Sequence, residues 1–243
     1  MKIALIGYGK MGKEIDRLAA EKGILVSARF DIDNPVIKES ADAPFDVAIH
    51  FAHPNSVVGH VEQLAALGKH LVIGTTGWQQ QFDQVRKTVE QFGIGCVHAT
   101  NFSLGVNLLL HLTRRAGELI NAFPEYDVFV HETHHKDKID SPSGTALSIT
   151  DELLKTIKRK KRMQLGNPEQ QMDPAALHVS SARGGTVVGT HTITFDSFAD
   201  SIELTHTAKN RSGFASGALV AAEWVKDKQG MFGMDDVLQS LVK

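Results

Sequence analysis

The chain has 243 residues, of which 42% are hydrophobic and 22% charged, and its formal net charge at pH 7 is -2. That length suffices for one large or two modest domains with hydrophobic cores. The near balance of charges gives no electrostatic reason to expect nucleic-acid or membrane binding. We interpret the one basic run, residues 158–162, as the solvated end of a predicted helix rather than as a binding patch.

The N-terminal apolar run reaches Gly7 before it attains the length of a signal-peptide core, and no later run approaches membrane-spanning length. The single cysteine, Cys96, excludes an intrachain disulfide and fits a reducing compartment. Because Cys96 lies in an apolar run, we expect it to pack in the core. These features predict a cytoplasmic protein.

A short apolar run, residues 3–6, is followed by a glycine-rich turn and then by helical spacing of apolar residues up to Gly23. The turn reads Gly7-Tyr8-Gly9-Lys10-Met11-Gly12, in the strand, turn and helix context that a dinucleotide-binding G-x-G-x-x-G motif requires. We expect Gly7 to permit the turn, Gly9 to let the backbone approach a pyrophosphate, and Gly12 to allow close packing of the helix on the strand.

The second predicted strand, residues 24–30, ends in Asp31, where a carboxylate can accept hydrogen bonds from the adenosine ribose. Asp31 would repel a 2′-phosphate, and Ile32 offers that phosphate no cation. The sequence therefore favours NADH, although Arg29 and Lys10 keep NADPH possible.

Predicted strands at residues 46–51, 70–73 and 94–99 alternate with predicted helices at 54–67 and 79–92. This order predicts an α/β fold with a Rossmann-type, doubly wound parallel sheet, whose ligands collect at the carboxyl ends of the strands. Two segments lie there, Gly74-Thr75-Thr76 and Ala99-Thr100-Asn101-Phe102. Backbone amides and the Asn101 side chain could hold a nicotinamide carboxamide. The alternative is turn chemistry for the first segment and a helix cap by Ser103 for the second.

After a predicted helix at residues 104–123 the chain becomes rich in strands, which we place at 126–134, 176–182, 186–195 and 201–208, with one helix at 145–158. This pattern predicts a smaller α+β domain with a mixed or antiparallel sheet. A later alanine-rich helix, 215–225, could pack back onto the first domain. We therefore expect a dinucleotide-binding domain of residues 1–104 and 214–243 and a substrate-binding and oligomerisation domain of residues 105–213.

Residues 131–135, His-Glu-Thr-His-His, match the H-E-x-x-H pattern of zinc metalloproteases. That pattern needs a helix, on which residues four apart share one face. The residues leading into it alternate as in a strand, where positions four apart are separated by roughly 13 Å. Two ligands of one zinc ion cannot be that far apart, so we predict no metal site here.

The chemistry of the second half is concentrated in residues 134–146. His134, His135 and Lys138 precede Ser143-Gly144-Thr145, a turn that opens a helix. A helix start presents unpaired amides that suit a carboxylate, while histidine and lysine can supply a proton or charge. The alternative is that His135 ends a strand, Lys138 is a solvated charge and Ser143 or Thr145 only caps the helix. Together these residues predict an acid-bearing site for a carboxylated substrate.

The stretch HHKDKIDSPSGTA resembles the H-H-x-x-K-x-D-x-P-S-G-T-A signature of dihydrodipicolinate reductases, also called 4-hydroxy-tetrahydrodipicolinate reductases, of lysine and diaminopimelate synthesis. The resemblance covers the whole chain. It includes G-T-T-G at 74–77, N-F-S-x-G-V-N at 101–107, R-G-G-T-V-V-G-x-H at 183–191 and F-A-x-G-A at 214–218.

The resemblance implies that His134 is the proton donor, that Lys138 is a second donor, and that His135, Gly144 and Thr145 hold the carboxylates of a cyclic dicarboxylate; we add Ser143 to this site. It also implies that NADH and/or NADPH binds at Gly7 to Gly12, Asp31, Gly74 to Thr76 and Ala99 to Phe102. A hydride would reduce a cyclic imine, with loss of water, in the cleft between the domains. Family members are typically homotetramers built through the sheet of the second domain.

Two departures from the family pattern stand out. Many relatives have G-x-x-G-x-x-G in the first turn, whereas this chain has Gly-Tyr-Gly-Lys-Met-Gly, and many have Ala at the position of Ser141. The first leaves the choice between NADH and NADPH open. Two alternative functions also remain: another NAD(P)H-dependent reductase of a carboxylated imine, and an NADH-sensing binding protein.

Overall fold

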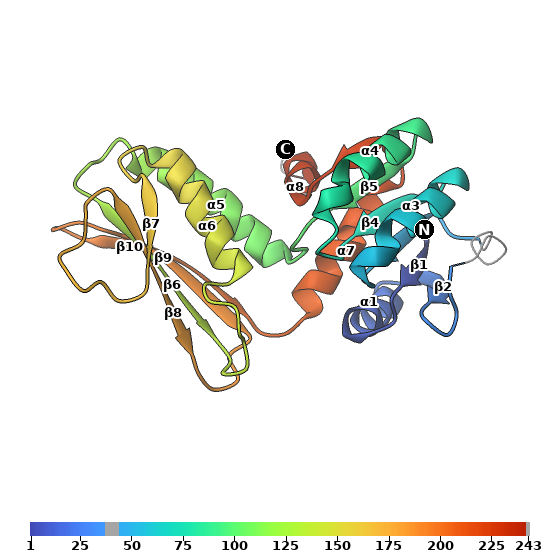
Figure 1. Ribbon diagram of the computed structural model, residues 1–243, viewed down its shortest axis with the longest axis horizontal. Helices are drawn as coiled ribbons and strands as arrows, with labels where there is room; N and C mark the ends of the chain where they lie inside the picture. The colour runs from blue at the N-terminus through green and yellow to red at the C-terminus, as the bar shows by residue number, and fades with distance from the viewer. Residues whose placement is uncertain (37–43, 242–243) are drawn as a thin grey trace. The chain divides into compact units, whose positions relative to one another are not determined.

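The structure is a computed structural model that describes residues 1–36 and 44–241. The chain divides into two compact units (Figure 1). Unit 1 comprises Met1–Leu104 and Arg211–Lys243, and unit 2 comprises Gly105–Asn210. Among the helices of the described ranges, none is long and apolar enough to cross a bilayer.

Unit 1 is built on a parallel sheet. Its described part has six strands in the order β11-β5-β4-β3-β1-β2, and every neighbouring pair is parallel. The strands are β1 (Lys2–Ile6), β2 (Leu25–Phe30), β3 (Val47–His50), β4 (His70–Ile73), β5 (Gly95–His98) and β11 (Gly230–Phe232). The helices are α1 (Lys10–Glu21), α3 (Val57–Ala66), α4 (Phe82–Gln91), α7 (Ser212–Val225) and α8 (Met234–Leu241), with short 3-10 turns η1 (Pro54–Ser56) and η2 (Gln79–Gln81) before α3 and α4. This arrangement confirms the predicted doubly wound sheet.

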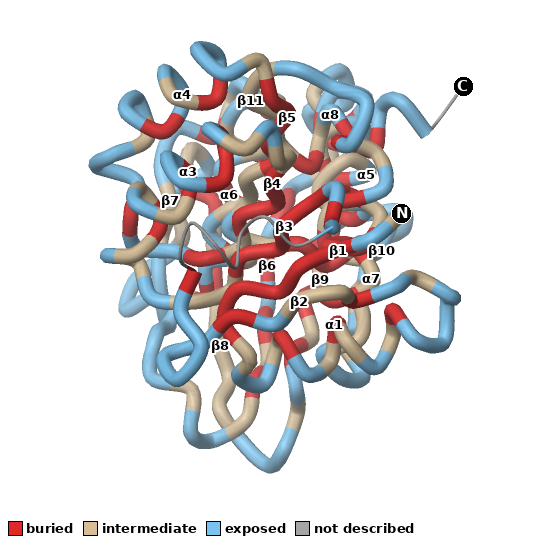
Figure 2. Tube along the Cα trace, turned by 90° about the vertical axis from the view of Figure 1, so that its right-hand side faces the viewer, coloured by how far each residue is buried: buried red, intermediate tan, exposed pale blue. Residues whose placement is uncertain are grey.

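Helices cover both faces of this sheet because its strands are apolar on both faces. In β1, Ile3 and Leu5 pack with α1 and α7, whereas Ala4 and Ile6 pack with α3 and α4. Figure 2 shows β1 and β3 coloured as buried along most of their length. Cys96 is fully buried in β5, as predicted, and burial raises the pKa of its thiol.

Unit 2 has a mixed sheet. Its described part has five strands in the order β10-β9-β6-β8-β7, with antiparallel pairs at the β10 side and parallel pairs at the β7 side. The elements are α5 (Leu104–Ile120), β6 (Asp127–His134), α6 (Gly144–Thr156), β7 (Arg162–Leu165), β8 (Ala176–Arg183), β9 (Gly189–Asp196) and β10 (Ser201–Ala208). Helices α5 and α6 pack on one face, through the core that includes Val128, Val130, Ile149 and Ile193. The predicted second sheet is therefore confirmed.

The basic run departs in part from the predicted solvated helix end: Lys158, Lys161 and Arg162 are exposed, but the run follows the end of α6 and Lys160 is buried. Lys160 lies beyond α6 and is only 3% exposed. Its ammonium donates to the carbonyl oxygens of Pro174 at 3.0 Å and Ala176 at 2.8 Å, and it pairs with Asp127 at 2.5 Å. The prediction was wrong for Lys160, because the sequence does not show which distant carbonyl groups surround this lysine in the fold.

Candidate functional site

Two glycines of the first turn are required by close backbone contacts. Gly7 has a φ of +90°, and a Cβ atom there would meet the carbonyl oxygen of Phe51. A Cβ atom at Gly12 would in turn meet the carbonyl oxygen of Gly7. Gly9 differs, because within the described structure no atom lies within 4 Å of where its Cβ would be. The turn therefore needs glycine at its ends and leaves open space at its centre.

The start of α1 presents backbone groups only. Gly9 is the N-cap residue, and in the described ranges no side chain caps the helix. Lys10 is exposed at the first helical position, and Met11 packs against the core. Free N–H groups and the positive end of the helix dipole make such a start suitable for a phosphate group.

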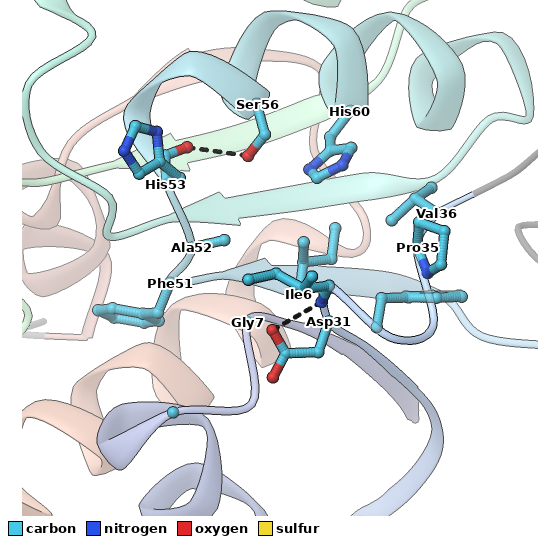
Figure 3. A pocket seen from close by; sticks show the side chains of 13 residues that line it. Ile6, Gly7, Asp31, Pro35, Val36, Phe51, Ala52, His53, Ser56 and His60 are labelled. Atoms are coloured by element: carbon cyan, nitrogen blue, oxygen red, sulfur yellow. Dashed lines mark hydrogen bonds between the residues drawn. The ribbon is translucent and has the colours of Figure 1, made fainter.

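A cavity of about 450 Å³ opens beside this turn (Figure 3). Asp31 lines it, and its carboxylate accepts hydrogen bonds from the backbone N–H groups of Tyr8 at 3.2 Å and Ile32 at 2.9 Å. His53 and His60 line the cavity from the segment after β3. The bare helix start, the exposed carboxylate and the cavity fit the phosphates, ribose and base of a dinucleotide.

Of the two cations that could serve a 2′-phosphate, Lys10 is exposed and Arg29 is already paired. Both Nε and Nη2 of Arg29 donate to the carboxylate of Asp16 at 2.7 Å, and the guanidinium lies 5.8 Å from the ring centroid of Tyr8. The Tyr8 hydroxyl also donates to Asp16. Ile32, the residue after Asp31, also lines the cavity. Its side chain is 92% exposed and carries no charge.

The segment after β4 is only partly available for a ligand. Thr75 is buried, and its hydroxyl contacts the Nδ1 atom of His50 at 2.7 Å and accepts from the N–H of Ala52 at 3.0 Å. A Cβ atom at Gly74 would overlap the ring of Phe51. The Thr75 side chain therefore joins the ends of β3 and β4, while Thr76 is exposed.

The segment after β5 has a similar division. Phe102 is 1% exposed and packs against Phe51 with ring centroids 6.0 Å apart, so its side chain belongs to the core. Asn101 accepts the N–H of Ser103 through its side-chain oxygen at 2.8 Å. Ala99 is half-buried and Thr100 is exposed. Because β4 and β5 are parallel, both segments lie at the carboxyl edge of the sheet, where the sequence places them.

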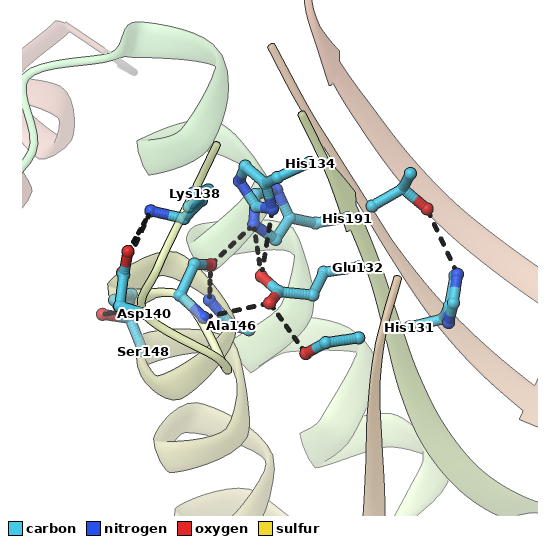
Figure 4. Close-up of polar contacts among 12 residues, drawn as sticks. His131, Glu132, His134, Lys138, Asp140, Ala146, Ser148 and His191 are labelled. Carbon is cyan, nitrogen blue, oxygen red and sulfur yellow. Dashed lines mark hydrogen bonds and ion pairs between the residues drawn. The ribbon is translucent and has the colours of Figure 1, made fainter. Parts of the chain in front are cut away.

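In unit 2, one face of β6 contributes both to the hydrophobic core and to the candidate site. Val128 and Val130 point into that core, and Glu132 and His134 continue the same face. His131 points away from Glu132, to the opposite side of the strand (Figure 4). Its Nδ1 atom lies 2.8 Å from the hydroxyl of Ser180. The predicted strand is confirmed, so His131 and Glu132 lie on different faces.

Glu132 is a fully buried carboxylate surrounded by donors. Its Oε1 atom accepts from the N–H of Ser143 at 3.0 Å, the hydroxyl of Ser181 at 2.8 Å and the guanidinium of Arg183 at 2.8 Å. Its Oε2 atom lies 3.5 Å from Nδ1 of His134 and 3.5 Å from Nε2 of His191. Figure 4 shows both imidazoles turned toward this carboxylate.

Burial and polar contacts act in opposite directions on the pKa of Glu132 and on that of His134. Burial raises the pKa of Glu132, but the nearby His191 ring and hydrogen bonds from Ser143, Arg183 and Ser181 outweigh it and lower that pKa well below its usual range. Burial lowers the pKa of His134 to about 4, against the attraction of Glu132. In the free protein Glu132 is therefore ionised and His134 is neutral at pH 7.

The loop after β6 brings the other predicted residues into the same unit. Lys138 donates to both carboxylate oxygens of Asp140, at 2.8 and 3.0 Å, so its charge is already paired. Ser143 caps α6 by accepting the N–H of Ala146 at 3.2 Å, as one alternative predicted. Gly144 is exposed at the helix start, while His135 and Thr145 are half-buried.

Sequence reasoning missed three members of this cluster. Arg183 and His191 reach it from β8 and β9, and Glu132 was considered only as part of the zinc pattern. The spacing of Glu132 and His134 was an available signal, because residues two apart on a strand share a face. Arg183 and His191 begin and end the R-G-G-T-V-V-G-x-H stretch of the family resemblance, but nothing in that stretch places them beside Glu132.

The cluster also has the dimensions of a metal site. Ligand atoms of Glu132, His134 and His191 lie within 4.8 Å of one another. However, the guanidinium of Arg183 already pairs with the carboxylate at 2.8 Å. A divalent cation there would lie beside that positive charge, so the contacts favour a hydrogen-bonded cluster over a cation site.

Comparison with known proteins agrees with this organisation. The family profile "Dihydrodipicolinate reductase, N-terminus" matches residues 1–102, and "Dihydrodipicolinate reductase, C-terminus" matches residues 105–238. A 4-hydroxy-tetrahydrodipicolinate reductase from Christiangramia forsetii is 38% identical over 245 residues and covers all of both chains. Another from Buchnera aphidicola is 36% identical over 203 residues, 80% of this chain and 72% of its own.

Among solved structures, a dipicolinate-bound dihydrodipicolinate reductase from Paenisporosarcina has the same fold. Its TM-score is 0.80 at 24% identity, over 96% of this chain and 97% of the other. Both family profiles together span nearly the whole chain, and the Christiangramia relative aligns from end to end. The chain belongs to the dihydrodipicolinate reductase family.

Proposed function

We propose that this protein is an NAD(P)H-dependent 4-hydroxy-tetrahydrodipicolinate reductase. The observation that carries the proposal is His134, buried beside Lys138 and the Ser143-capped start of α6, in a member of this family that also has a dinucleotide-type glycine turn. In the reaction the cyclic substrate loses water, and the resulting imine takes up one hydride and one proton to give tetrahydrodipicolinate.

Unit 1 would hold the cofactor. Bound NADH or NADPH supplies the hydride. The α1 start at Gly7 to Gly12 would hold the pyrophosphate through backbone N–H groups, and Asp31 would bind the ribose. The segments after β4 and β5 would contact the nicotinamide through their backbone and through exposed Thr76 and Thr100.

We assign NADH as the preferred cofactor. A 2′-phosphate would lie near the Asp31 carboxylate, and the pairing of Arg29 with Asp16 removes the nearest cation from that role. Ile32 supplies no replacement.

Unit 2 would hold the dicarboxylate and supply the proton. The N–H groups at the start of α6 and the positive end of its dipole suit one carboxylate, and Lys138 could exchange Asp140 for another. Burial lowers the pKa of His134 to about 4. A bound dianion beside the ring raises that pKa, because negative charge favours the imidazolium. Substrate binding would thus favour protonation of His134, which then donates this proton in the reaction.

We also propose that the enzyme is a cytoplasmic homotetramer. Cys96 is a buried free thiol, which fits a reducing compartment. The face of the unit 2 sheet opposite α5 and α6 carries exposed Phe129 and His131, together with threonine pairs between β9 and β10. An extended face of this kind can pair with copies of itself, and light scattering on the purified protein would measure the subunit number.

The decisive experiment is nucleotide oxidation with the condensation product of pyruvate and aspartate semialdehyde, using NADH and NADPH in parallel. Rapid oxidation that depends on this product supports the reductase. Oxidation only with other carboxylated imines would identify a different reductase. Binding of NADH without turnover of any imine would favour a cofactor-sensing protein.

A further inference from the structure

The buried Glu132 carboxylate points at the nitrogen of His134 that has no other partner. Within residues 1–36 and 44–241, neither Oε2 of Glu132 nor Nδ1 of His134 has a hydrogen bond of standard geometry, and the two atoms lie 3.5 Å apart. A buried carboxylate oxygen and a ring nitrogen that face each other are both satisfied only if the nitrogen carries the proton. This contact selects the Nδ1–H tautomer of His134.

The other ring nitrogen of His134 faces bare backbone. A Cβ atom at Gly189 would lie 2.9 Å from Nε2 of His134 and 3.2 Å from Cδ2. A side chain there would cover Nε2, whereas glycine leaves it uncovered. The N–H of Gly184 donates to the carbonyl oxygen of His134 at 2.9 Å and so holds the backbone of the residue that carries the ring. Nε2 is thus the atom free to exchange a proton with a ligand.

The same carboxylate also anchors the loop that carries the other predicted residues. Its Oε1 atom accepts the N–H of Ser143, the residue that caps α6. The Nη2 group of Arg183 donates hydrogen bonds to Oε1 of Glu132 at 2.8 Å and to the carbonyl oxygen of Asp140 at 2.7 Å. Glu132 therefore contacts the proton donor with one oxygen and the carboxylate-binding loop with the other.

We propose that Glu132 is a positioning residue: one carboxylate oxygen holds His134 as the Nδ1–H tautomer and stabilises its imidazolium form, while the other fixes the start of α6 beside it. His191 supports this arrangement. Its Nε2 atom lies 3.1 Å from the Ser143 hydroxyl and 3.5 Å from Glu132, so it links the two ends of the cluster. The proposal rests on the reductase function proposed above.

The test is a double-mutant cycle between Glu132→Gln and His134→Gln, with turnover measured at saturating substrate and cofactor. The matched control is Glu152→Gln, which makes the same change in a carboxylate of α6 that pairs with Arg114 and Lys155 instead. We expect Glu132→Gln to lower kcat by about 10- to 100-fold, as loss of an orienting partner commonly does. Affinity for NADH should stay unchanged, because that site lies in unit 1.

The double variant distinguishes positioning from general damage. If Glu132 acts through His134, adding Glu132→Gln to His134→Gln lowers kcat by no more than about twofold further. Losses that multiply, or a Glu132→Gln enzyme with the turnover of the wild type, would overturn the proposal.

A measurement on the unmodified protein covers the case in which Glu132→Gln does not fold. Nitrogen NMR of 15N-histidine-labelled wild-type protein, with His134→Gln used for assignment, reports which ring nitrogen carries the proton. The Nδ1–H form is expected, and the Nε2–H form would contradict the proposal. Stoichiometric metal in the purified protein, with loss of turnover on chelation, would also contradict it.

These readouts separate the reductase function from the positioning role of Glu132. Absence of imine reduction by the wild type would reject the reductase function. The His134 tautomer would still decide whether Glu132 holds the ring.

Discussion

The starts of α1 and α6 are both candidate anion sites, and they are built in opposite ways. The N-cap of α1 is Gly9, which offers backbone groups alone, next to the exposed carboxylate of Asp31. The N-cap of α6 is Ser143, which forms hydrogen bonds with buried Glu132 and with His191. Backbone groups suffice to hold a phosphate that does not react. The proposed delivery of a proton requires side chains held in fixed positions, as the hydrogen bonds of the buried cluster hold them.

The comparison predicts that a change in the unit 2 cluster lowers turnover and leaves the affinity of unit 1 for NADH unchanged. Replacing His134 by Gln removes the proposed acid and should lower kcat by about 100-fold or more. Steady-state kinetics and NADH fluorescence titration measure the two sites separately. His131→Gln is the matched control, because His131 lies on the opposite face of the same strand. Equal losses in both variants would remove His134 from the role of acid.

Unit 1 also contains a buried histidine, but its effect should be on stability. Burial, followed by repulsion from His60, lowers the pKa of His50 to about 3. Since the unfolded chain then binds the proton more tightly, stability falls as the pH drops from the unfolded pKa of about 6.5 toward about 3, by about 2 kcal/mol at pH 5.

Tryptophan fluorescence can measure this loss, because both tryptophans of the chain, Trp78 and Trp224, belong to unit 1. Denaturant unfolding at pH 7.5 and pH 5 gives the difference in stability. His50→Asn should reduce that pH dependence by about 2 kcal/mol. An unchanged dependence would show that another group titrates.

The backbone nature of the α1 site predicts that a single methyl group damages it. Gly7→Ala places a Cβ against the carbonyl oxygen of Phe51 at a φ of +90°, so the turn must shift. Affinity for NADH should fall by at least about tenfold, with a loss of stability above about 1 kcal/mol. Gly23→Ala is the control, because Gly23 also has positive φ, at 69°, but in the described structure no atom lies near its missing Cβ.

The smallest expected effect concerns the choice of cofactor. Ile32→Arg supplies an exposed cation next to Asp31 and should raise the ratio of kcat/KM for NADPH over NADH by about fivefold. Ile32→Gln changes the side chain without adding charge and should leave the ratio unchanged. A wild-type enzyme that already prefers NADPH would mean that Arg29 leaves Asp16 when the cofactor binds.

The sequence predicted unit 1 well because its signals are local. Most of β1 to β5 are short, largely apolar runs followed by a turn, and the glycine motif lies between β1 and α1. Three elements were missed: β7, β11 and α8. Strand β11 has only three residues and β7 is partly exposed, so neither shows the apolar pattern of a core strand. Their place is decided by pairing with neighbours, which a short segment does not reveal.

The candidate site of unit 2 was predictable only in part. His134, His135, Lys138 and the start of α6 are close in sequence, so the pattern and the family resemblance found them. The cluster around Glu132 depends on strand register, which pairs Glu132 with His191 on one side and Ser181 on the other. Spacing along one strand says which residues share a face, but it does not say which strands become neighbours.

The division of unit 1 between two parts of the chain has a consequence for synthesis. Helix α7 supplies Ala215, Ala218, Leu219, Ala222 and Val225 to the same core as β1, yet about a hundred residues of unit 2 are made between them. As the ribosome extends the nascent chain, unit 2 is complete before α7 emerges. Until α7 is made, the first hundred residues therefore keep this sheet face only partly covered, by α1, and exposed apolar surface at this stage favours aggregation or chaperone binding.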